Sequence, residues 1–179
     1  MGKIILVFLS ALDDRIINGL KQNLEKTFAR EVVVRLRIQN LAYAFDARRK
    51  QYKSPRLLSR LRRLKKDPDD KILGITDVDL YSPGYDFVYG EAEMSSGTAT
   101  LSLYRLKSRR PGTKPDSQIF QRRIVREATH EISHLYDLGH CENRKCVMRA
   151  CTCVAEVDRA GNKFCPRCHQ DLEKNLVRA

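Results

Sequence analysis

The stretch HEISHLYDLGHC, residues 130–141, combines helical spacing with a stop signal, and it indicates both a local fold and a chemistry. Residues four apart lie on one face of a helix, so His130 and His134 can present two imidazole nitrogens to one metal ion. Zinc is commonly bound by histidine at about 2.0–2.1 Å. Glu131 stands between them in sequence, where a carboxylate serves zinc hydrolases as general base. The stretch therefore predicts a helix that carries a hydrolytic zinc site.

His140 is the expected third ligand. An uninterrupted helix would carry it roughly 9 Å beyond His134 along the axis, so the helix must end first. Gly139 adopts a left-handed conformation at little cost and Asp137 tolerates it better than most residues, so a turn across residues 137–139 can return His140 to the metal. In a continued helix, Asp137 would share the face of His130 and would be the third ligand instead. We favour His140, because imidazole is a common zinc ligand and glycine supplies a stop signal.

Beyond this motif, the chain resembles the metzincin clan of zinc peptidases and, within it, the archaemetzincin family. The resemblance is carried by His130, Glu131, His134, His140, Cys141, Cys146, Met148, Cys165 and Cys168, with CPRC as the closing stretch. The family glycine three residues after the second histidine is Asp137 here. Residues 74–93 (GITDVDLYSPGYDFVYGEAE) and 102–106 (SLYRL) also look like family sequence. The likeness implies a zinc metallopeptidase with Met148 beneath the three imidazoles and an edge strand, for which residues 87–93 are the candidate, that binds substrate backbone.

All six cysteines fall between Cys141 and Cys168. In an intracellular chain such clustering favours metal binding over a disulfide framework. Cys165 and Cys168 can hold one zinc from a tight turn, and a closed structural site needs two more thiolates. Spacing alone leaves four candidates, Cys141, Cys146, Cys151 and Cys153. The family resemblance selects Cys141 and Cys146, which implies two zinc ions per chain, one catalytic and one structural. Free thiols or a disulfide are the alternative for this set and the favoured interpretation for Cys151 and Cys153.

The length of 179 residues and the 42% hydrophobic content suit one metallopeptidase domain over residues 1–179. Within it we expect a sheet-and-helix part at 1–139, ending in the active-site helix, and a Cys-rich part at 140–179 with Met148 and a final helix. Periodicity and turn residues predict strands at 3–9, 31–38, 71–80, 86–94 and 98–106, and helices at 13–28, from Ser54-Pro55 onward, at 116–138 and at 166–177. With the resemblance, this order implies an α/β (α+β) metzincin-like fold. Its sheet is mixed and mostly parallel with an antiparallel edge strand, packed by the active-site and C-terminal helices, beside a small four-cysteine zinc knuckle.

The net charge is +12, and residues 48–66 form a dense basic block. This block is compatible with binding of nucleic acid or an acidic partner, with steep salt dependence, or with the solvated face of an amphipathic helix. We favour the helix face, because no aromatic ladder accompanies the arginines and the chain lacks tryptophan. The alternative function is a zinc-stabilised basic binding protein whose histidine site is vestigial or regulatory.

The apolar run at residues 3–12 has no small-residue cleavage site, and no run approaches the roughly 18–20 apolar residues of a membrane span. We therefore expect a cytoplasmic, monomeric enzyme that acts on a peptide or protein substrate and does not contact a membrane.

Overall fold

The computed structural model describes residues 2–37, 39–107 and 116–178. Its main sheet has five strands in the order β2-β1-β5-β8-β7. Their bounds are Ile4–Phe8 (β1), Val32–Leu36 (β2), Lys71–Thr76 (β5), Gly90–Glu93 (β7) and Thr98–Ser102 (β8). β2, β1, β5 and β8 run parallel, and β7 pairs antiparallel with β8 at one edge. The expected mixed, mostly parallel sheet with an antiparallel edge strand is confirmed.

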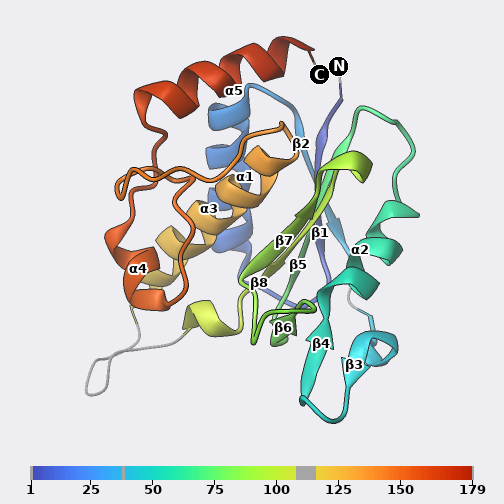
Figure 1. Cartoon of the computed structure of the whole chain (residues 1–179). Helices are drawn as coiled ribbons and strands as arrows, with labels where there is room; N and C mark the ends of the chain where they lie inside the picture. Colours follow the sequence, from blue (N-terminus) through green and yellow to red (C-terminus); the bar gives the residue numbers. More distant parts are fainter. Residues whose placement is uncertain (1, 38, 108–115, 179) are drawn as a thin grey trace.

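Helices cover both faces of this sheet (Figure 1). On one face α1 (Asp14–Phe28) and α3 (Ser117–His134) pack on the sheet, with α4 (Val154–Arg159) and α5 (Pro166–Arg178) on the same side of the molecule, and on the other face lies α2 (Ser54–Arg62). Each helix buries an apolar side, as α1 does with Ile17, Leu20, Leu24 and Phe28. Strand β1 is buried along its whole length, which explains its unbroken run of apolar residues.

The larger of two apolar clusters joins the early and late parts of the chain. Leu6 of β1 and Ile132 of α3 belong to it, together with Cys146, Met148 and Leu172 from the region after His140. The smaller cluster lies under α2 and includes Leu57, Leu61 and Ile72. The active-site helix therefore rests on a core to which the Cys-rich tail also contributes.

A second sheet of three short strands was not predicted, because two- and three-residue strands leave no periodic signal. It contains β3 (Phe45–Asp46), β4 (Gln51–Lys53) and β6 (Leu80–Tyr81), and short 3-10 helices span Ala42–Ala44, Met94–Ser96 and Arg105–Lys107. The expected strand at 86–94 begins only at Gly90, because Val88 pairs with Leu80 of β6 instead. The predicted strand at 71–80 is split between β5 and β6.

Ser54 connects α2 to the main sheet. It is the first residue of α2, and its hydroxyl lies 2.8 Å from that of Thr100 in β8, so it fastens the helix to the sheet. Ile38, the last residue of the strand expected at 31–38, lies outside the described residues.

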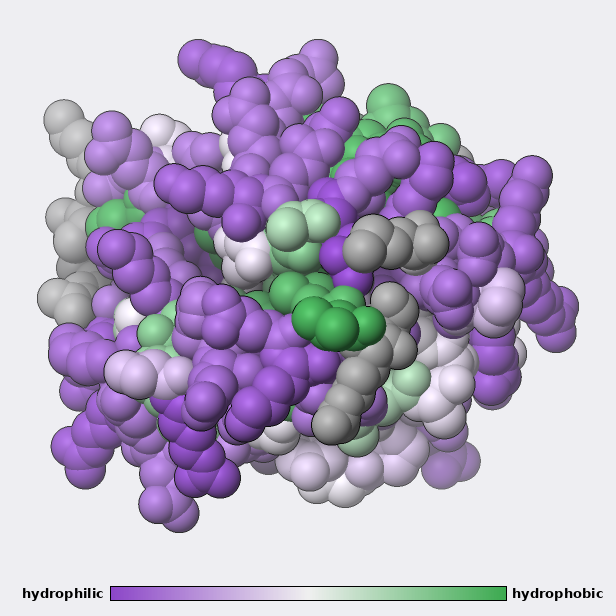
Figure 2. Space-filling model, turned by 90° about the horizontal axis from the view of Figure 1, so that it is seen from above, coloured by the Kyte–Doolittle hydropathy of each residue, from purple (hydrophilic) through white to green (hydrophobic). Residues whose placement is uncertain are grey.

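Among the described helices, none has both the length and the apolar character that crossing a membrane requires. Seen from the side on which α5 lies, the surface of the molecule is mostly hydrophilic, with small scattered hydrophobic areas (Figure 2).

Candidate active site and metal centres

Helix α3 presents the motif residues at its C-terminal end. It begins after Asp116, whose carboxylate accepts hydrogen bonds from the backbone N–H groups of Gln118 and Ile119. Ile124, Ala128 and Ile132 are fully buried and fix the helix on the sheet. His130 and Glu131, both 5% exposed, are thus held by a packed and capped helix.

The helix ends at His134, and Asp137 makes the turn. Asp137 has φ +59°, and the N–H of Leu138 reaches back to the carbonyl oxygen of Ser133 at 3.1 Å. This backward bond requires one left-handed residue, and the short polar side chain of aspartate tolerates that conformation. Of the two residues considered for the left-handed position, Asp137 adopts it and Gly139 does not. The continued helix that would have made Asp137 a ligand does not form.

The turn brings His140 to the two helical histidines. Ring centroids of His130 and His140 are 5.2 Å apart, and those of His134 and His140 are 4.9 Å apart. One ligand nitrogen from each histidine lies within 4.8 Å of the others. The Nε2 atoms of His130 and His134 are 3.1 Å apart, near the roughly 3.3 Å expected for two ligands of one tetrahedral zinc. The three imidazoles therefore fit a single zinc ion.

Backbone carbonyl groups orient two of these rings. Nδ1 of His130 lies 2.9 Å from the carbonyl oxygen of Val147, and Nδ1 of His134 lies 2.6 Å from that of Leu138. When each Nδ1–H donates to its carbonyl, each Nε2 keeps a free lone pair for a metal. Burial also lowers the pKa of His130 to about 3 and lowers the pKa values of His134 and His140. The rings are thus held in the neutral form that binds zinc.

The side chain of Glu131 points toward the edge strand β7. A Cβ atom built on Gly90 would lie 2.5 Å from the Cδ of Glu131, so the carboxyl group packs directly on the strand. Burial raises the pKa of Glu131 well above its usual value, with further contributions from Glu127 and Glu91. A desolvated carboxylate beside a metal site has the position and the basicity of a proton acceptor.

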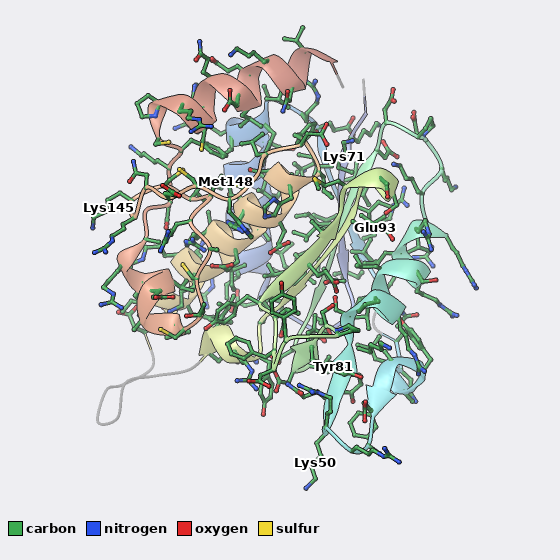
Figure 3. The ribbon with its side chains drawn as sticks, viewed as in Figure 1. Lys50, Lys71, Tyr81, Glu93, Lys145 and Met148 are labelled. Atoms are coloured by element: carbon green, nitrogen blue, oxygen red, sulfur yellow. The ribbon has the colours of Figure 1, made fainter. Side chains whose placement is uncertain are left out.

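Met148 lies fully buried on the segment that runs along α3 (Figure 3). Its carbonyl oxygen accepts a hydrogen bond from the N–H of Cys141 at 2.9 Å, and its neighbour Val147 orients His130. The segment around Met148 therefore contacts both ends of the histidine motif.

Sequence reasoning missed Arg126, which lies one turn before His130. Its guanidinium group is 1% exposed, pairs with Glu127 and donates to the carbonyl oxygen of Arg149. Its four-residue spacing from His130 could have placed Arg126 on the same face of the helix. The contact between Arg126 and Arg149, however, depends on tertiary packing. The contacts of the Val147 and Leu138 carbonyl groups with the histidines could not be predicted either, since every residue has a backbone carbonyl group.

The second cluster consists of four thiols. One sulfur each from Cys141, Cys146, Cys165 and Cys168 lies within 4.8 Å of the others. The sulfur atoms of Cys141 and Cys165 are 3.8 Å apart, which matches the roughly 3.8 Å between thiolates on a tetrahedral zinc at about 2.3 Å. The N–H of Cys168 bonds Cys165 and lowers the pKa of that thiol to about 7. These four cysteines fit a closed zinc site.

Cys151 and Cys153 lie outside this cluster, and all six cysteines are free thiols. Burial raises the pKa of Cys151 to about 11, and its sulfur lies 3.5 Å from the carbonyl oxygen of Arg149. A protonated, partly buried thiol such as that of Cys151 behaves as a small apolar side chain.

A groove of about 740 Å³ opens beside His140. The turn at residues 137–143 forms one wall, and α5 forms the other with Arg167, Asp171 and Lys174. The groove therefore offers charges of both signs next to the histidines.

Comparisons with known proteins agree with this geometry. The sequence matches the model of Peptidase family M54 over residues 11–174. It is 39% identical over 145 residues to an archaemetzincin of Pyrococcus horikoshii, covering 80% of this chain and 77% of that protein. The fold is similar to the crystal structure of archaemetzincin from Methanopyrus kandleri, with a TM-score of 0.86, 33% identity and coverage of 99% and 96% of the two chains. It is also similar to a zinc-dependent peptidase from Methanocorpusculum labreanum, with a TM-score of 0.82, 32% identity and coverage of 94% and 99%.

Proposed function

This chain belongs to peptidase family M54 and is a zinc-dependent metallopeptidase, and on that premise we propose that His130, His134 and His140 hold its catalytic zinc with Glu131 as general base. The observation that carries this assignment is the arrangement of the rings. Two Nε2 atoms lie 3.1 Å apart while both Nδ1 atoms face backbone carbonyl groups, and a buried carboxyl group adjoins them.

A zinc ion held by the three histidines would supply Lewis acidity, which lowers the pKa of a bound water to about 7 and would polarise a peptide carbonyl. Glu131 accepts one proton from the water as its oxygen attacks the carbonyl carbon. The same carboxyl group then returns that proton to the amide nitrogen as the C–N bond breaks. The products are one new carboxyl group and one new amine, so Glu131 ends as it began.

The edge strand β7 is the candidate surface for the substrate backbone. Gly90 pairs with Leu101, and the N–H of Ser102 bonds the carbonyl oxygen of Tyr89. In this antiparallel pattern, the N–H and C=O groups of Gly90 point away from β8 toward the open edge. An extended peptide can pair with them by strand addition. The groove beside His140 is the candidate surface for side chains of the substrate.

We also propose a second, structural zinc held by Cys141, Cys146, Cys165 and Cys168, giving two zinc ions per chain. Its role is to fasten the tail to the histidine motif, because Cys141 follows His140 directly. We further propose that residues 1–179 act as one monomeric domain in the cytoplasm, where thiols stay reduced.

The basic block at residues 48–66 is better explained by the fold than by nucleic-acid binding. Arg49 stacks over Tyr81, Arg60 stacks over Tyr43, and Arg56 bonds the carbonyl oxygen of Tyr43. Two further cations, Arg62 and Lys65, contact Glu93 and the carbonyl oxygen of Ser96. These contacts support the interpretation of the block as the solvated face of α2 and its flanking segments, and nucleic-acid binding stays an unfavoured alternative.

The decisive experiment replaces Glu131 with glutamine and measures zinc content beside cleavage of a peptide library. We expect cleavage to fall roughly 10²–10⁴-fold with unchanged zinc. Glu173→Gln, which alters an exposed carboxylate of α5, is the matched control. Full activity of Glu131→Gln at full zinc occupancy would exclude Glu131 as the general base.

A further inference from the structure

Gly90 faces helix α3 from the edge of the sheet. Successive strand residues point to opposite sides. Glu93 pairs with Arg62 of α2 at 3.4 Å, so odd-numbered positions of β7 face away from α3 (Figure 3). Gly90 and Ala92 consequently face α3, where Ala92 packs on the main core. The two inward residues of this strand are thus the two smallest.

The side chain of Glu131 fills the space that a side chain at Gly90 would need. A Cβ at Gly90 would lie 2.5 Å from Cδ, 2.5 Å from Oε1 and 2.6 Å from Cγ of Glu131, and real Cβ atoms essentially never approach other atoms closer than 3.0 Å. All three close contacts are to the one residue that the mechanism uses as a base. Glycine at this position therefore has a steric reason.

Backbone conformation does not supply a second reason. The described glycines with positive φ are Gly84 and Gly97, and Gly90 is not among them. An alanine could adopt the backbone angles of Gly90 without strain. The methyl group of that alanine would, however, displace the carboxyl group of Glu131.

Neither helix α3 nor strand β7 can move away freely to relieve this contact. On the helix side, Ala128 and Ile132 flank Glu131 and are fully buried, so α3 cannot move back without opening the core. On the strand side, β7 is bonded to β8, where Leu101 opposite Gly90 is also fully buried. The flexible element is the side chain of Glu131 itself, so added bulk at Gly90 would displace the carboxyl group.

We propose that Gly90 is a positioning residue that sets the distance between the general base Glu131 and strand β7. Through its backbone the same residue faces the open edge at which substrate would pair. One glycine thereby fixes the base relative to the bound peptide. This proposal rests on the assignment of Glu131 as general base.

A double-mutant cycle in the zinc-loaded protein tests the contact without any substrate. Thermal unfolding is measured for wild type, Gly90→Ala, Glu131→Ala and the double variant. We expect Gly90→Ala to lower the Tm by roughly 3–10 °C, as overpacking does, and to change it by less than about 2 °C when Glu131 is already alanine. Equal losses in both backgrounds would overturn the proposal.

Kinetics test the consequence for catalysis. In the Glu131 background, Gly90→Ala should lower kcat roughly 10²-fold with KM within about threefold and zinc content unchanged, because the backbone groups of residue 90 remain. An unchanged kcat, or loss of zinc, would overturn the positioning role. Failure of Glu131→Gln to reduce cleavage would instead refute the base assignment, so the two failures are distinguishable.

Gly74→Ala is the matched control, since it creates a clash of similar severity elsewhere. A Cβ at Gly74 of β5 would lie 2.4 Å from a methyl group of Leu61, under α2. This variant should lose stability equally with or without Glu131 and should keep the kcat of wild type. A kcat loss in Gly74→Ala as large as that in Gly90→Ala would show a general effect of sheet strain and would also overturn the proposal.

Discussion

Arg126 of helix α3 donates a hydrogen bond to the carbonyl oxygen of Arg149 at 2.5 Å, so the active-site helix grips the backbone immediately after Met148. Its guanidinium group also pairs with the buried Glu127. The cation therefore links the helix that carries His130 to the segment around Met148.

Replacing Arg126 with methionine should destabilise the protein. The substitution keeps an unbranched side chain but leaves Glu127 buried without its partner. Burial already raises the pKa of Glu127, so this carboxyl group can take up a proton, and we expect a loss of about 3 kcal/mol, the lower end for a broken buried pair. Urea unfolding measures the loss. Adding Glu127→Gln should recover part of it, and no recovery would place the damage at Arg149 instead.

Zinc stoichiometry should separate the two metal centres. Elemental analysis of dialysed protein is expected to give two zinc ions per wild-type chain and one in a His130→Ala, His134→Ala variant. His169→Ala is the control, because that exposed ring lies outside both clusters. One zinc in both proteins would leave only the cysteine site tightly filled and would count against the histidine assignment.

Loss of one cysteine ligand should lower the affinity of the histidine site for zinc. Cys168→Ser removes one thiol of the structural cluster without changing a histidine, yet His140 and Cys141 are consecutive. We expect zinc affinity at the histidines to fall roughly tenfold or more, as it does when supporting groups are lost. Competition with a chelator measures this affinity. Cys153→Ser, on an exposed thiol, should leave it unchanged, and the same result for Cys168→Ser would refute the coupling.

Asp137 should tolerate glycine better than a branched residue. Glycine relieves the left-handed conformation but adds freedom to the unfolded chain, so Asp137→Gly should change stability by less than about 1 kcal/mol. Asp137→Val should cost about 1–2 kcal/mol and reduce zinc binding at His140. Thermal unfolding and zinc titration check both. Equal behaviour of the two variants would contradict the role given to the turn.

Local signals in the sequence were sufficient for much of this architecture. The apolar spacing from Ile17 to Phe28 predicted α1, and the long helix was predicted to start at residue 116, one residue before its observed start at Ser117. The end of that helix was placed four residues too far, at Leu138 rather than His134. Apolar spacing continues past the turn, because Leu135 and Leu138 remain buried in the core after the helix has ended.

The features that sequence could not supply depend on contacts between distant segments. The carbonyl oxygen of Val147 reaches His130 across 17 positions, and Gly90 meets Glu131 across 41. Nothing in the local pattern of FVYGEAE distinguishes a glycine that weakens a strand from one that makes room for a carboxyl group. Helical spacing predicted the histidine ligands and the family likeness selected Cys141 and Cys146, but the supporting partners of these ligands required the folded chain.

The turn at Asp137 makes the segment between His134 and His140 just long enough to join them. Five residues join His134 to His140, and two backbone bonds, from Asp137 to His134 and from Leu138 to Ser133, draw that segment tight. Substitutions here can be absorbed as long as the left-handed residue survives. Insertions and deletions cannot, because one residue more or less would turn His140 away from its partners and Cys141 away from its own. The length of this segment, more than its composition, is what the two metal centres require.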